Sequence, residues 1–307
     1  MTSYALIVNP KSGRGLALRK AQALGKALPG SSSVEILETT HRGAATDFAE
    51  GSVGTVDRVI AVGGDGTLNE VIDGLMRSAL AAPQLPELGF LPAGTANAGS
   101  KAFRLPADPE VVGKSLATAE TRLLDVGMVR HAGGERAFLL WFGAGWDAVV
   151  IDALNSSRTG LMGISGMLGH APHVIRALAA YDQPTIAAEV DGVPFGPHAS
   201  LVVANVGEIA FGGRVAEGAD PCDARFNIVG VPRLSVPRAT RFAFRMMTSS
   251  LTRSRGVQLE LGAHVTLRSD GEVPFHLDGE PVGKLPATVR MVPGAVRFLS
   301  PMVDTGI

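Results

Sequence analysis

The sequence predicts an α/β fold in which an N-terminal doubly wound, mainly parallel sheet domain is joined to a C-terminal β-rich, β-sandwich-like domain. In the first 125 residues, short apolar runs alternate with amphipathic segments of helical spacing. After residue 125 the apolar segments are shorter and are separated by Gly, Pro and Asp, which is typical of antiparallel strands. The length of 307 residues is sufficient for two domains.

Four strands and three helices account for the first domain. The expected strands are Tyr4–Val8, Val34–Leu37, Val56–Val62 and Leu88–Leu91. The expected helices are Leu16–Ala27, Ala44–Glu50 and Thr67–Leu80. In a sheet of this kind, ligands bind beyond the carboxyl ends of the strands.

The second domain is expected to consist mainly of strands with two helical insertions. Its apolar segments are Phe138–Phe142, Ile186–Val190, Leu201–Val206 and Phe226–Val231, and its helical segments are Leu161–Tyr181 and Pro237–Leu251. We therefore predict a first domain over residues 1–125 and a second over residues 126–291.

Composition and charge exclude several classes of protein. The formal net charge is −1, so the chain as a whole does not attract nucleic acid. The single cysteine, Cys222, cannot form an internal disulfide, and the first residues lack the pattern of a signal peptide. The apolar runs are far shorter than the roughly 20 residues that span a bilayer. We expect a cytoplasmic protein.

A glycine-rich loop, residues 63–70, follows the third predicted strand and opens a helix. Its glycines, Gly63, Gly64 and Gly66, allow backbone N–H groups to approach phosphate oxygens closely, and Thr67 and Asn69 add polar groups where the helix dipole favours an anion. Asp65 has the same charge sign as phosphate, so we interpret it as acting through the Mg²⁺ of a nucleotide. The alternative is a simple turn that Asp65 caps.

Two further loops resemble the first in composition and position. Residues 9–13 and 92–97 each combine Gly with a hydroxyl side chain and an Asn directly after a predicted strand. Three such turns after parallel strands should converge on one crevice at the edge of the sheet.

Late in the chain, Asp278 and Glu280 flank Gly279 in an extended segment. A carboxylate can accept the proton of an attacking hydroxyl in phosphoryl transfer, so this pair is a candidate base. From spacing alone, an Asp-Gly hairpin turn is the more common interpretation.

One glycine pattern is interpreted as structural. Residues 143–148 fit Gly-x-Gly-x-x-Ala after an apolar strand, but no suitable acid lies about 20 residues further on. The pattern also falls in the β-rich half, so a packing role is favoured over dinucleotide binding.

Taken together, these segments resemble the diacylglycerol kinase catalytic family of bacterial lipid kinases, which also includes sphingosine kinases. The resemblance extends over nearly the whole chain, and the order of its motifs is specific. The motifs that carry it are Asn9-Pro10-Lys11-Ser12-Gly13, Gly63 to Glu70, Leu91 to Asn97, Phe211-Gly212-Gly213 and Leu277-Asp278-Gly279-Glu280.

The resemblance implies an ATP site on the glycine loop and a base in the second domain. ATP is expected at Asn9, Thr39, Gly63, Gly64, Asp65, Gly66, Thr67, Asn69 and Thr95. Asp278 would be the general base toward a lipid hydroxyl, with Glu280 supporting Asp278 or the metal. The last strand, near residues 296–299, is expected to return to the first domain, so that residues 292–307 complete it.

The family also implies a structural Mg²⁺ in the second domain, after the Gly-Gly segment. At the matching positions Asp223 would supply a carboxylate, and Asp220 and Arg225 would supply mainly backbone carbonyls. Two positions depart from the family pattern: Ala98 stands where an Asp is usual, and Ala224 stands where a Gly is usual. The first departure affects a carboxylate network linked to the metal, and the second affects the structural cation site.

A basic segment suggests how a lipid substrate is reached. Arg238, Arg241 and Arg245 fall along one face of the predicted helix over residues 237–251, and such a face can lie against anionic headgroups. A solvated basic face is the equal alternative. We expect peripheral association with the inner membrane face, a lipid partner and no nucleic-acid partner, and the sequence leaves a homodimer open.

The leading interpretation is an ATP-dependent lipid kinase that uses Mg²⁺. A kinase of a soluble nucleotide, such as NAD, is a competing enzyme; residues 68–70 and the Asp278–Glu280 pair argue against it. A catalytically silent lipid or nucleotide sensor is the third interpretation, suggested by Ala98 and Ala224.

Overall fold

A computed structural model describes residues 1–95, 97–116, 118–156, 164–207, 214–235, 245 and 254–300. The chain forms two compact units: unit 1 comprises Met1–Val126 and Val292–Ile307, and unit 2 comprises Gly127–Met291. Unit 1 contains a parallel sheet flanked by helices and unit 2 contains antiparallel sheets, which confirms the predicted fold class.

The sheet of unit 1 is parallel and buried. Its order is β2-β1-β3-β4-β16, formed by β1 (Ser3–Val8), β2 (Ser33–Glu38), β3 (Arg58–Gly63), β4 (Glu87–Pro92) and the end of β16 (Ala287–Ser300). In β1, β3 and β4, the last five residues of each strand are buried, as expected for strands covered on both faces. The exposed strand β2 forms the edge.

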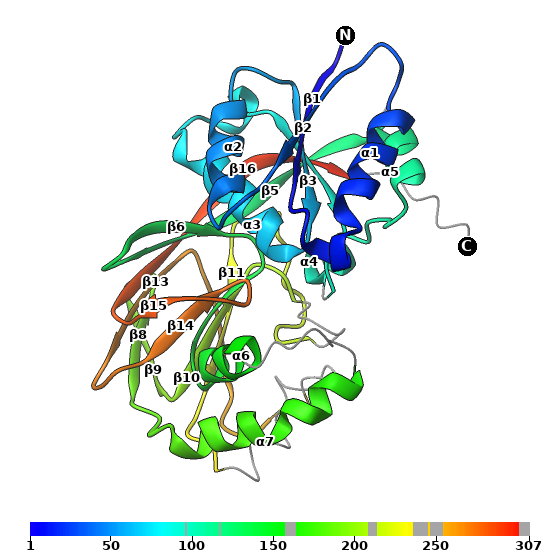
Figure 1. Cartoon of the computed structure of the whole chain (residues 1–307). Helices are drawn as coiled ribbons and strands as arrows, with labels where there is room; N and C mark the ends of the chain where they lie inside the picture. Colours follow the sequence, from blue (N-terminus) through cyan, green and yellow to red (C-terminus); the bar gives the residue numbers. More distant parts are fainter. Residues whose placement is uncertain are drawn as a thin grey trace, which may run out of the picture. The chain divides into compact units, whose positions relative to one another are not determined.

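Helices cover both faces of this sheet (Figure 1). The helices α1 (Ala17–Ala27) and α5 (Pro109–Leu116) pack on one face, and α2 (Ala44–Ser52) and α3 (Asp65–Arg77) lie on the other. The core beneath α1 and α5 includes Leu6, Ile60 and Leu299. Short elements complete the unit: η1 (Ser12–Gly15), η2 (Ala82–Gln84) and α4 (Ala98–Ala102).

Two long strands, β5 (Glu120–His131) and β16, carry the chain between the units. Within unit 1, the buried carboxylate of Asp125 accepts a hydrogen bond from the Gly294 N–H at 2.7 Å, which joins the middle of β5 to β16. The ring of Phe298 lies 5.0 Å from that of Phe103. The end of the chain therefore contributes to the core of unit 1.

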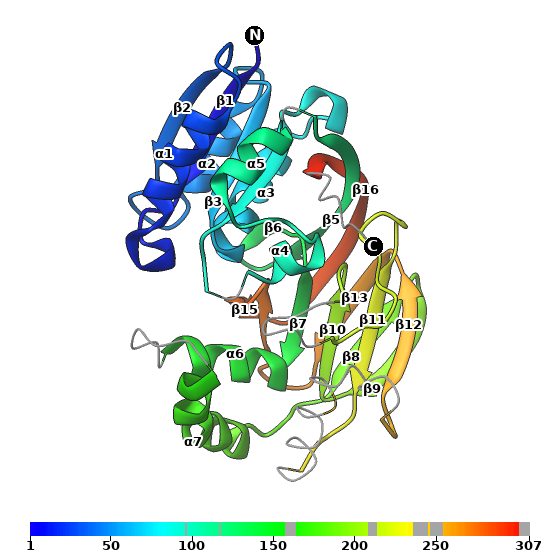
Figure 2. The same ribbon diagram turned by 90° about the vertical axis from the view of Figure 1, so that its right-hand side faces the viewer.

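Unit 2 is a sandwich of antiparallel sheets (Figure 2). One sheet has the order β16-β13-β8-β9, and β5 pairs with both β16 and β6; the other has the order β12-β11-β10-β7-β14-β15. The remaining strands are β6 (Gly134–Phe138), β7 (Trp141–Gly145), β8 (Ile186–Val190), β9 (Val193–His198), β10 (Ser200–Ala204), β11 (Phe226–Val231), β12 (Gln258–Gly262), β13 (His264–Ser269), β14 (Pro274–Leu277) and β15 (Glu280–Lys284). Side chains from both sheets share one apolar core.

The described residues of unit 2 include two helices. The helix α6 (Trp146–Ser156) packs on β7 and β14, and α7 (Ile164–Ala180), which lies within the predicted helix over residues 161–181, packs against α6. The predicted helix over residues 237–251 lies, apart from Arg245, outside the described residues. Among the helices described, none is both long and apolar enough to span a membrane.

The structure corrects the prediction of one strand over residues 138–142. The strand β6 ends at Phe138 and β7 begins at Trp141, with a bend at Leu139 and Leu140 between them. The N–H groups at the bend donate to a side chain, Asp278, rather than to a neighbouring strand. An apolar run alone does not reveal such a break.

Candidate active site

Three loops meet at the carboxyl edge of the unit 1 sheet, as predicted. The Asn9 N–H donates to the Val62 carbonyl at 3.1 Å, which ties the loop after β1 to β3. The Gly63 carbonyl accepts the N–H groups of Ala93 and Gly94, at 2.7 and 3.1 Å, which ties the loop after β3 to the loop after β4. These bonds hold the loops to one another through backbone atoms.

Two glycines bring the loops after β3 and β4 into close contact. A Cβ placed on Gly94 would lie 2.6 Å from the Cα of Gly64, closer than such atoms can be. The contact between the two glycines is therefore one of backbone atoms, with the side chain of Asn97 beside Gly94. It lies next to the first turn of α3, where N–H groups lack intrahelical partners. Such a cradle fits a phosphate group.

The side chain of Asp65 is anchored to a neighbouring helix. Its Oδ2 accepts the N–H of Ala98 and its Oδ1 accepts the N–H of Gly99, each at 2.9 Å. Asp65 therefore caps the start of α4 rather than the turn in which it lies, which differs from the alternative weighed from the sequence. Because a carboxylate oxygen can accept more than one hydrogen bond, this capping leaves acceptor capacity for a hydrated cation.

Glu70, at the end of the glycine loop motif, caps a different helix. Its Oε1 and Oε2 accept the N–H groups of Gly43 and Ala45, at 3.1 and 3.3 Å, at the beginning of α2. The helix α3 thus carries two carboxylates that fix the neighbours on either side. Nothing in the local sequence indicates these partners, which lie 25 to 34 residues away.

Lys20 of α1 supports the third loop. Its Nζ donates to the carbonyls of Pro92 and Ala107, both at 2.9 Å. Burial lowers the pKa of Lys20, an effect opposed by the nearby carboxylate of Asp108. The sequence indicated only a polar helix position here.

The predicted ATP ligands differ in exposure. Thr67 and Asn69 are buried, with 6% and 3% of their surface exposed. Asn9 and Thr39 are half-buried at the strand ends, where the Thr39 N–H donates to the Val8 carbonyl, and Thr95 is exposed. Asp65 is half-buried, and Lys11, in the same loop as Asn9, is exposed.

In unit 2, Asp278 and Gly279 form the turn of the hairpin between β14 and β15. Their φ angles of +49° and +85° are left-handed, and Leu277 pairs with Glu280 across the turn. This arrangement is the two-residue Asp-Gly turn that spacing favoured. Glu280 is half-buried as the first residue of β15.

The carboxylate of Asp278 is buried and bound by the backbone. Its Oδ2 accepts the N–H of Leu139 at 2.9 Å, and its Oδ1 accepts those of Leu140 and Trp141 at 2.9 and 2.8 Å. Only 7% of the residue is exposed. Three N–H donors stabilise the anionic form of the side chain and fix its position.

The segment predicted to bind the structural Mg²⁺ lies on the surface of unit 2. Asp220, Asp223 and Arg225 are exposed, and the Oδ1 atoms of the two aspartates accept the N–H groups of Cys222 and Arg225. Ala224 has a φ of +61°, a conformation that glycine adopts at no steric cost.

No group of three or more His, Cys, Asp or Glu side chains in the described ranges is arranged to hold a metal ion. A site built mainly from backbone carbonyls and one carboxylate would not form such a group. The Phe211-Gly212-Gly213 segment lies outside the described residues.

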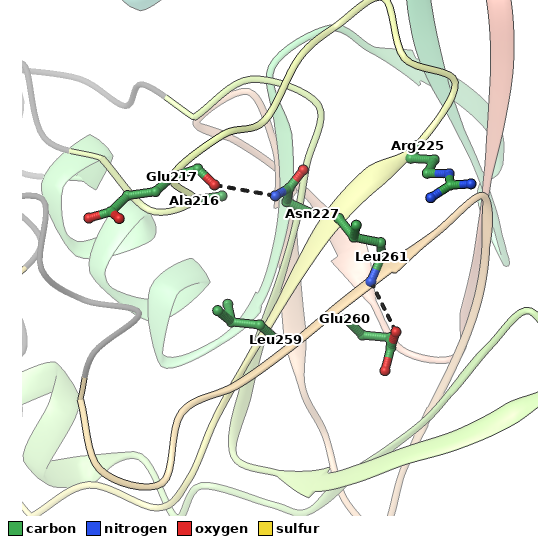
Figure 3. Close-up of a pocket in the computed structure, with 7 residues that line it drawn as sticks. All are labelled: Ala216, Glu217, Arg225, Asn227, Leu259, Glu260 and Leu261. Atoms are coloured by element: carbon green, nitrogen blue, oxygen red, sulfur yellow. Dashed lines mark hydrogen bonds between the residues drawn. The ribbon is translucent and has the colours of Figure 1, made fainter.

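A pocket of about 500 Å³ lies beside β11 and β12 (Figure 3). It is lined by Ala216, Glu217, Arg225, Asn227, Leu259, Glu260 and Leu261. The Asn227 Nδ2 donates to the Glu217 carbonyl at 3.5 Å. Because β10 and β7 separate β11 from β14, the pocket is distinct from the turn that carries Asp278.

Each half of the chain matches a domain model of known proteins. Residues 3–129 match the family model of the diacylglycerol kinase catalytic domain, and residues 141–300 match that of the YegS C-terminal NAD kinase beta sandwich-like domain. The chain is 26% identical over 300 residues to a protein of Chromohalobacter salexigens named "Probable lipid kinase YegS-like", covering 96% of this chain and 92% of that protein.

Two further comparisons are similar in extent. A diacylglycerol kinase of Bacillus subtilis is 25% identical over 296 residues, covering 93% of this chain and 92% of the relative. The crystal structure of a diacylglycerol kinase from Bacillus anthracis superposes with a TM-score of 0.71 at 19% identity, covering 97% of each chain. At that identity the structural match establishes the fold.

Proposed function

The chain belongs to the diacylglycerol kinase catalytic family, and we propose that it is an ATP-dependent kinase that phosphorylates a lipid hydroxyl such as that of diacylglycerol. The names of its relatives support a lipid kinase. The observation that carries the proposal is the buried, backbone-anchored carboxylate of Asp278 in the hairpin turn that matches the family motif.

In unit 1, the three loops would bind the nucleotide. Their backbone cradle at Gly64 and Gly94 supports a phosphate ligand, and the positive end of α3 favours its charge. Asn9, Thr39 and Thr95 would contact other parts of ATP. Thr67 and Asn69, which are buried, would act mainly by fixing the loop.

In unit 2, Asp278 would act as the general base. The acceptor hydroxyl oxygen forms a bond to the γ-phosphorus, the bond to the ADP oxygen breaks, and the hydroxyl proton passes to Asp278. Three N–H groups hold this carboxylate in one orientation, so little conformational entropy is lost when it is aligned with the hydroxyl. Glu280 would support Asp278 from the next position of the hairpin.

Mg²⁺ is proposed in two places. Asp65 would reach the nucleotide-bound ion through water, and Asp220, Asp223 and Arg225 would hold a structural ion. Carboxylate and carbonyl oxygens are the ligands that Mg²⁺ prefers, so these donors fit the ion. When bound with ATP, Mg²⁺ neutralises charge on the phosphates.

We propose peripheral contact with an anionic membrane through Arg238, Arg241 and Arg245. Of these, Arg245 is described, and its Nη1 donates to the Ser254 Oγ at 3.0 Å. Replacing all three with Gln should weaken sedimentation with vesicles that contain phosphatidylglycerol and leave binding to neutral vesicles unchanged.

The test is transfer from radiolabelled ATP. The protein would be offered diacylglycerol, a sphingoid base, extracted membrane lipids and, separately, NAD. Labelling of a lipid supports the proposal, and labelling of NAD supports a soluble-nucleotide kinase instead. If ATP binds but no substrate is labelled, the chain is a silent lipid or nucleotide sensor, an outcome that Ala98 and Ala224 make worth measuring.

A further inference from the structure

A buried histidine lies beside the proposed base. His276, on β14, has no exposed surface, and its Nδ1 accepts the N–H of Gly279 at 3.2 Å. The imidazole ring therefore bridges the same turn that contains Asp278. In a two-residue turn with both central residues at positive φ, this bond fixes the peptide that follows the aspartate.

The second nitrogen of the ring has a charged partner. The Nε2 of His276 lies 2.9 Å from the Oδ2 of Asp147, in the first turn of α6. Since Nδ1 accepts a hydrogen bond, the proton is assigned to Nε2, which donates it to the carboxylate. Asp147 thus fixes the ring, and the ring fixes the turn.

The glycine pattern over residues 143–148 builds this arrangement. A Cβ on Gly143 would clash with both the Oδ2 of Asp147 and the Nε2 of His276. Gly145, at a φ of +91°, turns the chain from β7 into α6, which places Asp147 beside β14. The two glycines of the pattern that resembles a dinucleotide fingerprint are thereby accounted for, because Gly143 leaves room for the His276–Asp147 pair and Gly145 directs the chain into α6.

Other contacts confine the ring. The ring of Trp141 meets His276 edge-on at 6.1 Å, and the Trp141 N–H is one of the three donors to Asp278. The Trp141 carbonyl accepts the Asp278 N–H at 3.0 Å. The base is consequently held at its carboxylate and at its backbone N–H, and the pair with Asp147 secures the following residue.

We propose that His276 and Asp147 are positioning residues, which lock the Asp278–Gly279 turn in the conformation that presents the base. The inference rests on the proposed function of Asp278. Neither residue is required to contact substrate for this role, so the effect on turnover should exceed the effect on substrate binding.

The experiment compares three variants of the full-length protein. Asp147→Ala removes the acceptor of the Nε2–H, and we expect kcat for lipid phosphorylation to fall about 100-fold, as for a misplaced catalytic group, with KM for ATP within about twofold of the wild type. Asp147→Asn keeps an acceptor oxygen, and its kcat should stay within about threefold. The matched control is His198→Leu, which replaces another buried histidine of unit 2 that does not contact the turn.

Three outcomes would overturn the inference. The first is an unchanged kcat in Asp147→Ala. The second is a kcat in Asp147→Asn that falls as far as in Asp147→Ala. The third is a kcat in His198→Leu that falls as far as in Asp147→Ala when the two variants have the same shift in Tm. The last would mean that general destabilisation of unit 2, rather than the turn, governs turnover.

A second measurement separates this inference from the proposed function. If the wild type phosphorylates no lipid, the proposed function fails, and hydrogen exchange then decides the positioning role. Asp147→Ala should exchange the Gly279 N–H at least about 10-fold faster than Asp147→Asn does, because the ring is no longer fixed. Equal exchange rates in the two variants would refute the role of the pair.

Discussion

The two candidate sites are built in opposite ways. In unit 1, loops that directly follow parallel strands form the candidate site, and backbone contacts hold these loops together. In unit 2, a single carboxylate is the site, and its partners Leu139, Leu140 and Trp141 lie 137 to 139 residues away in the sequence. A phosphate cradle follows from local sequence and sheet topology, whereas the proposed base depends on contacts made only when unit 2 has folded.

The largest effect is expected where the long-range contacts converge. Asp278→Asn should lower lipid phosphorylation by about 100-fold or more, because the base is lost. It should also lower the free energy of unfolding by about 1–3 kcal/mol, since an amide NH₂ would face backbone donors. Radiolabel transfer and thermal unfolding measure the two effects. ATP affinity, measured by calorimetry on the folded protein, should be retained; its loss would contradict the assignment of ATP to unit 1.

The backbone cradle is tested by adding one carbon. Gly94→Ala places a Cβ against Gly64, and such overpacking costs about 1–3 kcal/mol unless the loops move apart. Because the loops would then no longer keep their positions, we expect the Kd for ATP to rise about 10-fold or more. Gly51→Ala, in α2 where a Cβ meets nothing within 4 Å, is the control and should stabilise slightly. An unchanged Kd in Gly94→Ala would mean that phosphate does not approach these glycines.

Removing the cap that Glu70 provides should have a smaller effect on stability and on ATP binding. Glu70→Ala leaves the Gly43 and Ala45 N–H groups without their acceptor, which should cost about 1 kcal/mol of unfolding free energy, with ATP affinity reduced only a few-fold. Chemical denaturation of this variant and of Glu50→Ala, an exposed position of α2, the helix that Glu70 caps, checks this. Equal stability of the two variants would argue against the cap.

The smallest effect concerns pH. Burial lowers the pKa of His198, so the folded state favours the neutral ring. The stability that the neutral ring allows is fully present above about pH 6.5, the ordinary pKa of histidine, and is lost as the pH falls toward the lower pKa of His198 in the folded state. Between pH 7.5 and 5.0, Tm should therefore fall less in His198→Leu than in the wild type. Part of the fall should persist, because burial also lowers the pKa of His131.

The parallel half of the fold could be predicted because its strands are continuous apolar runs between helical segments. The strands β1, β3 and β4 lie close to their expected ranges, and the convergence of their loops follows from parallel topology. The short helices α4 and α5 were not predicted, since neither has a long amphipathic pattern.

The contacts within the sites were less accessible from sequence. The capping partners of Asp65 and Glu70 belong to other helices, and the pairing of His276 with Asp147 joins residues 129 positions apart. Residue type gives no indication of such partners, because the distance in sequence is unrelated to the distance in space. The hairpin at Asp278 was accessible, because Asp-Gly is a turn signal by itself.

The route of β16 has a consequence for synthesis on the ribosome. Unit 1 contains the first residues of the chain, yet Val296, Phe298 and Leu299 of β16 are buried in it. Unit 1 therefore cannot complete its core until residues 296–299 have been translated, whereas unit 2, the continuous segment Gly127–Met291, is finished earlier. Domains usually fold in the order of their synthesis, and here that order is reversed for the last step.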